Sequence, residues 1–299
     1  MTPDIIVVIV TYNSAHVIGG LLDSIPAAAD GLTYHVVVVD NGSKDGTTEL
    51  ISTRGDCHVI YSQNTGYAGG INRGVRAAGP AGAILILNPD MRLHEGAIPP
   101  LLAALDDPEV GIAVPQIRSP SGSVERSLRR EPTPARALGL NWTGAPVLAE
   151  YLTGPRDYET PRTVDWATGA AFLMSRKCYE AVGGWDESFF LYSEETDVCL
   201  RARDLGLLTR YEPRSVMVHI GGQSGRDHRT HAMQIVNRVR LYRRRHGSPA
   251  SWCYFGLTVA SELSWMLRGH GHSWHAVLAL LMPSRRPPEI MCSDHLMPQ

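Results

Sequence analysis

The sequence predicts an α/β protein built on an open, mostly parallel sheet. Three continuous, largely aliphatic runs, at 5–10, 35–40 and 83–88, recur within the first 90 positions. Uninterrupted runs of this kind are typical of parallel strands that are buried on both faces. The segments between them have helical character, and alternating strands and helices build a parallel sheet whose ligands bind beyond the carboxyl ends of the strands.

The elements follow one another regularly at first and less regularly later. In chain order we predict a strand at 5–10, a helix at 15–25, a strand at 35–40, a helix near 46–54, a short strand at 57–61, a helix at about 67–78 and a strand at 83–88. Residues 118–165, rich in Pro, Gly, Ser and Arg, are predicted as a long irregular insertion. Further on we expect a loop leading into a strand at 164–174, a helix after Ser193, helices from about 228, and a loosely ordered tail after Pro283.

Composition excludes several classes of protein. The 299 residues contain 28 Lys+Arg and 30 Asp+Glu, and 43% of them are hydrophobic. This composition excludes fibrous and wholly disordered chains, and the net charge of −2 excludes a uniformly basic nucleic-acid binder. The charge is nevertheless segregated, because residues 226–246 hold seven arginines and one acid.

The cysteines and the N-terminus predict a cytoplasmic protein. The five cysteines form no CxxC pair, which favours a reducing compartment over a disulfide framework. Residues 1–10 lack the features of a signal peptide. No run of 18 apolar residues occurs, so we expect no membrane-spanning helix.

The first two strands end in polar residues. Thr11, Tyr12 and Asn13 stand where a dinucleotide-binding protein has its glycine-rich turn, which argues against a dehydrogenase. Asp40 ends the second strand and can accept hydrogen bonds from a ribose or a base. The alternative is a loop carboxylate that caps the helix near 46, a role that Asp45 fits equally well.

Two later motifs also suit a phosphate-containing ligand. The run 64–74 contains four glycines, which can let a ligand approach backbone amides at a helix start, although a plain glycine-rich turn explains it as well. Asp90, in Asn-Pro-Asp after the strand at 83–88, can bind Mg²⁺ or Mn²⁺ together with substrate phosphates. A simple β-turn is the alternative for this motif.

An acidic cluster follows the aromatic residues 189–192. Glu194, Glu195 and Asp197 begin a predicted helix, where the helix dipole favours negative charge, and Asp197 can pair with Arg201. Adjacent carboxylates against an apolar wall can also raise one pKa and create a general base.

Taken together, five motifs resemble those of inverting family 2 glycosyltransferases with the GT-A fold. They lie at 10–13, 39–43, 64–74, 87–90 and 189–201, and the resemblance extends over about 5–222. The Asn-Pro-Asp motif and the trailing basic segment are most similar to bacterial rhamnosyltransferase-like members. The resemblance implies a Rossmann-like domain at 1–225, with a nucleotide-binding half (1–90) and an acceptor-binding half (91–225), followed by a basic and apolar helical extension at 226–299.

The resemblance also implies roles for individual residues. Those expected to bind the nucleotide sugar are Thr11, Tyr12, Asn13, Asp40, Asn64, Gly66, Asn72, Asn88 and Asp90. Asp90 would hold Mg²⁺ or Mn²⁺, with His219 as a second ligand to the metal or diphosphate, although His219 alone would be interpreted as structural. The acceptor side would consist of Thr168 and Gly169 in the wall of the sugar pocket, together with Trp185 and Asp186.

One departure from the family pattern concerns the catalytic base. The family usually has Glu-Asp at this position, whereas this chain has Glu194-Glu195. Glu195 would then be the base, with one methylene more than Asp. Either the acceptor sits slightly farther away, or Glu194 takes part, or the activity is reduced.

The implied reaction is a single displacement that moves a sugar, with rhamnose as the candidate, from a dTDP- or UDP-linked donor to an acceptor hydroxyl. A glycan on a polyprenyl diphosphate is the favoured acceptor, and a soluble natural product is the alternative. The apolar segment 252–267 and the basic cluster 238–245 suit a peripheral helix on the inner face of the plasma membrane, or equally a packing helix or a homodimer interface. A sugar nucleotidyltransferase and a non-catalytic nucleotide-sugar-binding homologue are the alternatives from other classes.

Overall fold

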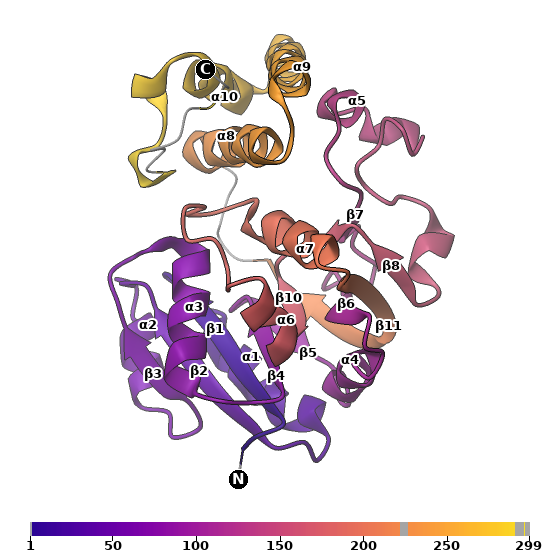
Figure 1. The fold of residues 1–299 in the computed structure, drawn as a ribbon. Coiled ribbons are helices and arrows are strands. Elements are labelled where there is room, and N and C mark those ends of the chain that lie inside the picture. Colours follow the sequence, from indigo (N-terminus) through magenta and orange to yellow (C-terminus); the bar gives the residue numbers. More distant parts are fainter. Residues whose placement is uncertain (1, 222–226, 291–295, 297–299) are drawn as a thin grey trace.

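The computed structural model describes residues 2–221, 227–290 and 296, and Figure 1 shows its elements in chain order. The strands of its central sheet are β1 (Ile5–Thr11), β2 (Tyr34–Asp40), β3 (His58–Tyr61), β4 (Ala83–Leu87), β5 (Met91–Leu93), β6 (Val110–Arg118), β8 (Arg162–Val164), β10 (Ala171–Ser175) and β11 (Leu208–His219). Their order is β3-β2-β1-β4-β10-β6-β11-β5, and β8 pairs with β11. The first four strands are parallel, whereas β10 runs antiparallel to both of its neighbours. The predicted α/β fold with a mostly parallel sheet is confirmed.

Helices cover both faces of this sheet. One face packs against α1 (Ile18–Ala29), α2 (Thr47–Ser52) and α4 (Ile98–Ala104). The other face packs against α3 (Gly66–Ala78), α6 (Arg176–Ala181) and α7 (Glu194–Asp204). This arrangement explains the uninterrupted apolar runs, because alternate side chains of a strand point to opposite faces.

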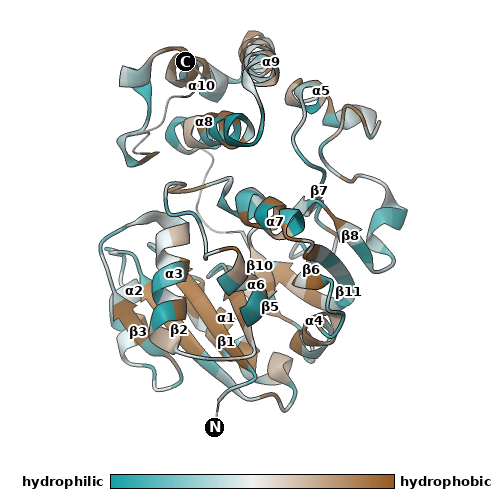
Figure 2. Cartoon of the chain, in the orientation of Figure 1, coloured by the Kyte–Doolittle hydropathy of each residue, from teal (hydrophilic) through white to brown (hydrophobic). Residues whose placement is uncertain are grey.

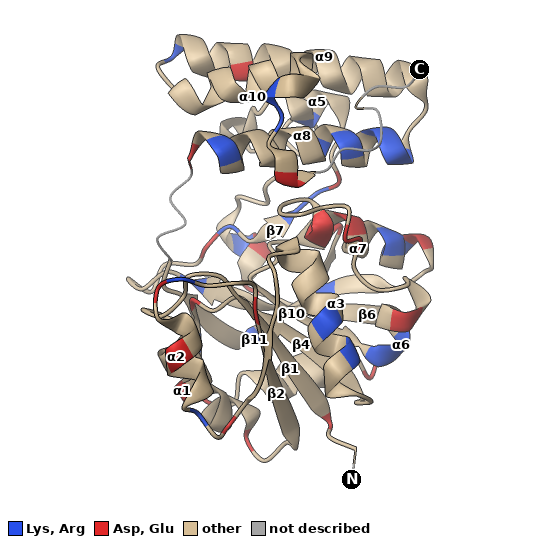
Figure 3. Ribbon diagram, turned by 90° about the vertical axis from the view of Figure 1, so that its left-hand side faces the viewer, with Lys and Arg blue, Asp and Glu red and all other residues tan. Residues whose placement is uncertain are grey.

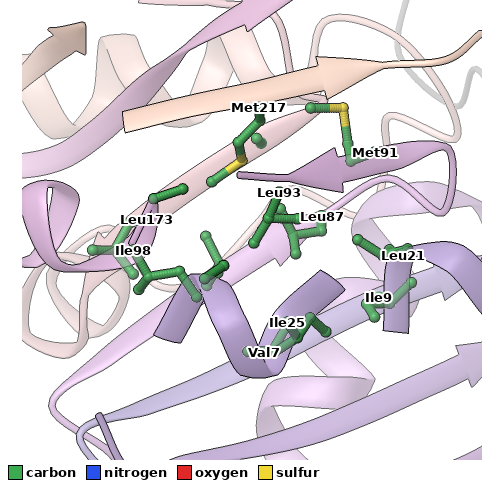
Figure 4. Packing of buried hydrophobic residues seen from close by; sticks show 14 of the residues in the cluster. Val7, Ile9, Leu21, Ile25, Leu87, Met91, Leu93, Ile98, Leu173 and Met217 are labelled. Carbon is green, nitrogen blue, oxygen red and sulfur yellow. The ribbon is translucent and has the colours of Figure 1, made fainter. Parts of the chain in front are cut away.

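The core residues of β1 illustrate the point. Val7 and Ile9 pack against Leu21 and Ile25 of α1 in one cluster, as Figure 4 shows, whereas Val8 belongs to the cluster on the opposite face. All five side chains are essentially inaccessible to solvent. In Figure 2 the central strands are accordingly among the most hydrophobic parts of the ribbon.

The predicted elements of the first 90 residues differ from the observed ones mainly at helix ends, whereas β5, α4, β6, α6 and β11 were not predicted. The helix predicted at 15–25 runs from Ile18 to Ala29, and no side chain caps its first turn. The insertion 118–165 is irregular, as expected, and contains only short elements: β7 (Leu128–Arg129), α5 (Pro134–Ala137), the 3-10 turns Asn141–Thr143 and Pro155–Tyr158, and the edge strand β8. The short strand β7 pairs with β9 (Trp166–Ala167) outside the main sheet.

A helical layer follows the sheet domain. It consists of α8 (His228–Arg245), α9 (Ser248–Leu267) and α10 (Gly271–Leu281), and α5 of the insertion packs on α9. In Figure 1 this layer lies beyond α7, at the end of the molecule opposite the N-terminus. Its apolar cluster includes Phe190, Leu191 and Tyr192, which precede α7. Within the described residues no helix is long and apolar enough to cross a membrane. The described part of the tail predicted after Pro283 contains two 3-10 turns, Pro283–Arg285 and Pro288–Ile290, and residues 291–295 and 297–299 lie outside the described residues.

Candidate active site

The carboxyl ends of β1 and β2 are joined by a network centred on Asp40. Its carboxylate accepts hydrogen bonds from Thr11 Oγ1 (2.9 Å), from the backbone amide (3.0 Å) and hydroxyl of Ser43, and from Thr48 Oγ1 (3.3 Å). A carboxylate has about four acceptor positions. Protein donors therefore fill the acceptor positions of this buried carboxylate. Asp40 thus connects the loops after β1 and β2, which would surround a nucleotide.

Tyr12 and Asn13 lie at the open side of these loops. The Tyr12 side chain is 55% exposed, which leaves its ring accessible to a base. Asn13 has a left-handed backbone (φ 53°), and its side-chain oxygen accepts a hydrogen bond from the amide of Lys44 (2.8 Å). Asn13 thus joins the β1 loop to the β2 loop.

The glycines of the run 64–74 serve packing between protein segments. A Cβ on Gly66 (φ +81°) would collide with the backbone of Phe190, and the amide of Tyr67 donates to the Phe190 carbonyl (2.8 Å). Gly70 and Gly74 lie against valines of β1. The amide of Gly66 is also bonded to the side-chain oxygen of Asn64 (3.0 Å). The sequence left open whether these glycines admit a ligand or form a plain turn, and in the structure protein atoms make the close contacts to Gly66, Gly70 and Gly74.

Asn72 anchors the turn that carries Trp185. Its amide nitrogen donates to the Trp185 carbonyl (2.8 Å) and to Glu187 (2.9 Å), and its oxygen accepts from the Trp185 amide (3.0 Å) and the Tyr179 hydroxyl (2.8 Å). The Trp185 ring is 2% exposed and packs edge-on against Phe172. Both side chains therefore lie behind the predicted pocket and support its wall.

Asp186 pairs with the C-terminal helical layer. One of its oxygens lies 2.9 Å from Arg244 of α8, and the other accepts from the amide of Ser188 (2.9 Å). The predicted acceptor residue Asp186 is thus a contact between the sheet domain and α8.

Asp90 and His219 meet at the carboxyl end of β4. His219 Nε2 lies 3.1 Å from Asp90 Oδ2, and its Nδ1 lies 3.3 Å from Glu125 Oε2 of the insertion. β5 pairs with the end of β11 and brings Met91 opposite His219. The hydrogen bond that the His219 ring donates to the Asp90 carboxylate raises the pKa of His219 to about 9. The motif Asn-Pro-Asp and the late histidine, 129 positions apart, therefore form one group.

The residues of this group suit Mg²⁺ or Mn²⁺. A carboxylate oxygen and an imidazole nitrogen are both ligands of Mn²⁺, and adjacent ligands of an octahedral ion with bonds of about 2.1 Å lie about 3 Å apart. No group of three or more His, Cys, Asp or Glu side chains in the described parts of the chain is arranged to hold a metal ion. A cation here would take its other ligands from substrate phosphates and water.

The predicted sugar-pocket wall lies between this group and the acidic helix. The amide of Asn88 bonds to the Ala170 carbonyl (2.9 Å), and the amide of Thr168 to the Ser127 carbonyl (2.9 Å). A Cβ on Gly169 would lie 3.3 Å from the Cβ of Glu195. Gly169 therefore lies directly against the predicted base.

Glu194 and Glu195 begin α7, as the sequence predicts. Tyr192 (φ 68°) and Ser193 (φ 75°) precede them in left-handed conformations, which non-glycine residues rarely adopt. Burial raises the pKa of Glu195 to about 7. Burial and the Glu195 charge raise the pKa of Glu194 well above its usual value, and Glu194 is only 3% exposed. Asp197 pairs with Arg201 (2.6 Å), which was the simple interpretation of its position.

Tyr67 is a site residue that the sequence reasoning missed. Its hydroxyl donates to the Gly169 carbonyl (3.3 Å). Burial, together with the charges of Glu194, Asp90 and Glu195, raises the pKa of Tyr67 well above its usual value, so the hydroxyl stays protonated. Tyr67 thus lies among carboxylates that belong to separate sequence motifs. Its position within the glycine run 64–74 did not indicate that it would lie near them.

Two residues of the insertion also belong to the site. Glu125 contacts His219, and the positive charge of Arg129 opposes the rise in the pKa of Glu195. The Arg129 guanidinium lies 3.7 Å from the centre of the Tyr151 ring. Nothing in the sequence distinguishes these two from the other charged residues at 118–165.

The basic segment 226–246 faces the sheet domain more than solvent. Arg238 pairs with Glu150, Arg245 with Asp204 (2.7 Å) and Arg244 with Asp186, while Arg240 is fully buried. Figure 3 shows the arginines of α8 in the layer next to the acidic start of α7. The predicted basic platform for an anionic acceptor is therefore largely turned inward. Gly222, the end of the resemblance, and Arg226, the start of the basic segment, lie outside the described residues.

Comparison with known proteins gives consistent results. The family described as Glycosyl transferase family 2 matches residues 6–183. N-acetylglucosaminyl-diphospho-decaprenol L-rhamnosyltransferase of Mycobacterium tuberculosis (strain ATCC 25618 / H37Rv) is 33% identical over 250 residues, which cover 77% of this chain and 81% of the relative. Low-salt glycan biosynthesis hexosyltransferase Agl10 of Haloferax volcanii is 33% identical over 208 residues, 68% of this chain and 62% of the relative.

Solved structures show the same fold. The mannosyltransferase PcManGT from Pyrobaculum calidifontis, in complex with GDP-Man and Mn²⁺, has a TM-score of 0.55 at 17% identity and covers 97% of this chain and 83% of its own. GalNAc-T7 with UDP, GalNAc and Mn²⁺ has a TM-score of 0.60 at 17% identity, with 80% and 47% coverage. The family match gives no support to a sugar nucleotidyltransferase. The chain is a glycosyltransferase and belongs to glycosyl transferase family 2.

Proposed function

We propose that the protein transfers a sugar, with rhamnose as the leading candidate, from a dTDP- or UDP-linked donor to a hydroxyl of a polyprenyl-diphosphate-linked glycan, with inversion. The position of Glu195 carries the proposal. This half-buried carboxylate lies at the start of α7 against Gly169, and its pKa is raised to about 7. The printed name of the 33% identical mycobacterial relative supports rhamnose and the lipid-linked acceptor.

Glu195 is the general base in this proposal. It accepts the proton of the acceptor hydroxyl while that oxygen attacks the anomeric carbon, and the nucleoside diphosphate leaves from the opposite side. A base works best when its pKa lies near the working pH, which a value of about 7 satisfies. Burial and the charge of Glu195 raise the pKa of Glu194 well above its usual value, which favours a neutral Glu194 beside an ionised Glu195.

Asp90 and His219 would hold the divalent cation. A bound Mg²⁺ or Mn²⁺ supplies positive charge next to the departing diphosphate. To bind the cation, the imidazole of His219 would have to release the proton that it shares with Asp90. Tyr67 keeps Gly169 in place through its hydroxyl and so fixes the wall between the cation and the base.

A lipid-linked acceptor calls for contact with a membrane, and α9 suits this contact. Its buried residues are largely polar: Ser251, Tyr254, Thr258, Ser261 and Glu262. Trp252 (52% exposed), Leu263 (36%) and Leu267 (82%) instead face outward, and Glu262 is the helix's one charged residue. Other apolar residues of α9, Phe255, Leu257 and Val259, pack against the C-terminal layer. The outward-facing apolar side chains, with Arg268 at the helix end, suit a peripheral helix in the headgroup region of the inner leaflet of the plasma membrane.

Vesicle flotation tests the membrane contact. We expect the protein to float with anionic vesicles, and we expect the double variant Trp252→Ser, Leu267→Ser to remain in the dense fraction. Leu205→Ser is the matched control, because Leu205 is about as exposed as Trp252 but lies directly after α7, away from α9. Absence of flotation at low salt would contradict the contact, and a dimer lost in the double variant would instead identify the surface as a homodimer interface.

Product analysis tests the reaction itself. The purified chain is incubated with Mn²⁺ or Mg²⁺, dTDP-rhamnose or UDP-sugars, and a synthetic N-acetylglucosaminyl diphosphate lipid. We expect metal-dependent release of nucleoside diphosphate and an inverted glycosidic bond, both abolished by Glu195→Gln. Transfer to a soluble hydroxyl compound, with none to the lipid, would favour the natural-product alternative. Absence of nucleoside diphosphate release from every donor would favour a binding protein.

A further inference from the structure

The base segment, residues 186–193, is the later part of the connection between α6 and α7 and leads directly into Glu194 and Glu195. Its last two residues, Tyr192 and Ser193, are consecutive non-glycine residues with positive φ. Non-glycine residues adopt such a conformation at an energetic cost, so the surrounding structure must hold it. Ser193 gives no side-chain capping bond to α7. The conformation is therefore held by contacts from other elements.

Asn237 of α8 supplies contacts at this point. Its side-chain nitrogen donates to the carbonyls of Leu191 (2.9 Å) and Tyr192 (3.2 Å). Asn237 has no exposed surface, although it belongs to a helix of the C-terminal layer. One amide thus binds two successive carbonyl groups immediately before the left-handed turn.

Arg240 fixes which way this amide points. Its Nη1 donates to the Asn237 oxygen (2.8 Å) and to the Ser188 carbonyl (3.2 Å). A guanidinium can only donate, so the Asn237 oxygen must face Arg240 and its NH₂ group must face the two carbonyls. Arg240 also lies 5.2 Å from the centre of the Phe189 ring.

Helix α3 holds the other side of the base segment. The Tyr67 amide binds the Phe190 carbonyl (2.8 Å), and Gly66 provides the space for this approach. The base segment therefore passes between α3 of the sheet domain and α8 of the C-terminal layer, with donors from both on carbonyls 188, 190, 191 and 192.

We propose that Asn237, held by Arg240, is a positioning residue for transfer: it fixes the left-handed turn at Tyr192 and Ser193 and so directs Glu195 toward the acceptor hydroxyl. The C-terminal layer is then part of the catalytic apparatus as well as the proposed membrane contact. This inference rests on the proposed role of Glu195 as base.

Asn237→Asp tests the proposal, because it retains the shape and the acceptor for Arg240 while it places an oxygen against the two carbonyls. We expect kcat to fall roughly ten- to hundredfold, as for a small displacement of a catalytic group. The affinity for the nucleoside diphosphate with Mn²⁺ should not change, because Asn237 does not contact the nucleotide loops. Adding Ser193→Gly should restore part of the lost kcat, since glycine adopts positive φ without strain.

The matched control is Arg245→Gln, which removes a contact of the same helix with Asp204 at the far end of α7. Should Asn237→Asp fail to fold, Asn237→Ala gives the same comparison without an added charge. The proposal is overturned by an unchanged kcat, by an equal loss in Arg245→Gln, or by no recovery with Ser193→Gly. A fully active Glu195→Gln variant would instead refute the base itself, which separates the two failures.

Discussion

Glu195 takes the place at which the family resemblance leads one to expect aspartate, and the structure shows how its environment accommodates it. Gly169 has no Cβ and leaves space beside the first carbons of the glutamate side chain. Burial raises the pKa of Glu195 to about 7. The longer side chain of Glu195 therefore packs against Gly169, in a position with little access to solvent.

The raised pKa predicts a specific pH dependence. Only ionised Glu195 can accept a proton, so kcat should rise from pH 6 to pH 8 and then level off.

Because the pKa of Glu195 is raised in the folded state, the protonated form stabilises the fold at low pH, and this stabilisation is lost as pH rises through 7. Glu195→Gln should thus lower kcat by about two to four orders of magnitude. Relative to the parent protein, the variant should gain more free energy of unfolding at pH 8 than at pH 5. Profiles of kcat and denaturant unfolding at both pH values measure this, and a parent profile that is flat from pH 6 to 8 would contradict it.

Glu125 should matter through His219. A carboxylate on the second nitrogen of a histidine fixes the orientation of the ring, and its loss typically weakens metal binding about ten- to a hundredfold. We expect Glu125→Gln to weaken Mn²⁺ binding by about tenfold, as measured by electron paramagnetic resonance of free Mn²⁺. Glu159→Gln, at an exposed position of the same insertion, is the control. Equal affinities in the two variants would show that Glu125 does not orient His219.

At the scale of elements, α3 depends on Gly66 for its position against the base segment. Gly66→Ala forces a side chain into a positive-φ position and against the Phe190 backbone. We expect it to lower the free energy of unfolding by about 2 kcal/mol or more and to reduce kcat. Gly55→Ala, where a Cβ would meet nothing within 4 Å, should leave both unchanged. Denaturant unfolding and kcat measurements of the two variants test this prediction, and equal values for both variants would contradict it.

Within the first 90 residues the sequence predicted strands better than helix ends, but it did not predict the two longest strands, β6 and β11. Runs such as 83–88 are buried on both faces, so hydrophobicity alone marks their limits, and the observed strand is Ala83–Leu87. Helix α1 begins three residues later than predicted because no capping residue marks its start. The motif residues Asp90 and Glu195 could be singled out because they stand next to recognisable runs. Glu125 and Tyr67 could not, since only tertiary contacts bring them to the site.

On the scale of the whole molecule, the charge segregation seen in the sequence serves mainly to join two layers. Arg238 of α8 and Glu150 of the insertion form a pair in which the glutamate side chain is only 6% exposed, and the Tyr254 hydroxyl also contacts Arg238 (2.6 Å). The positive segment and part of the negative remainder thus attract one another within the chain.

Breaking this pair should destabilise the C-terminal layer. Glu150→Ala leaves Arg238 without its carboxylate, and removal of one partner of a buried pair typically costs about 3–5 kcal/mol. We expect a lower midpoint of thermal unfolding and earlier proteolysis in residues 228–290. Glu180→Ala removes an exposed pair with Arg176 and serves as the control, with little expected change. Similar midpoints for the two variants would show that the Glu150 pair contributes no more than a surface pair.

The outward-facing residues of the C-terminal layer have a practical consequence for spectroscopy. Three of the six tryptophans, Trp142 (81% exposed), Trp252 (52%) and Trp274 (45%), lie in or beside this layer, whereas Trp185 is buried. Red-shifted intrinsic fluorescence should therefore come mainly from this end of the molecule. The chain carries its own optical probe, and the emission maximum or quenching by brominated lipids can follow the surroundings of this end during turnover without an attached label.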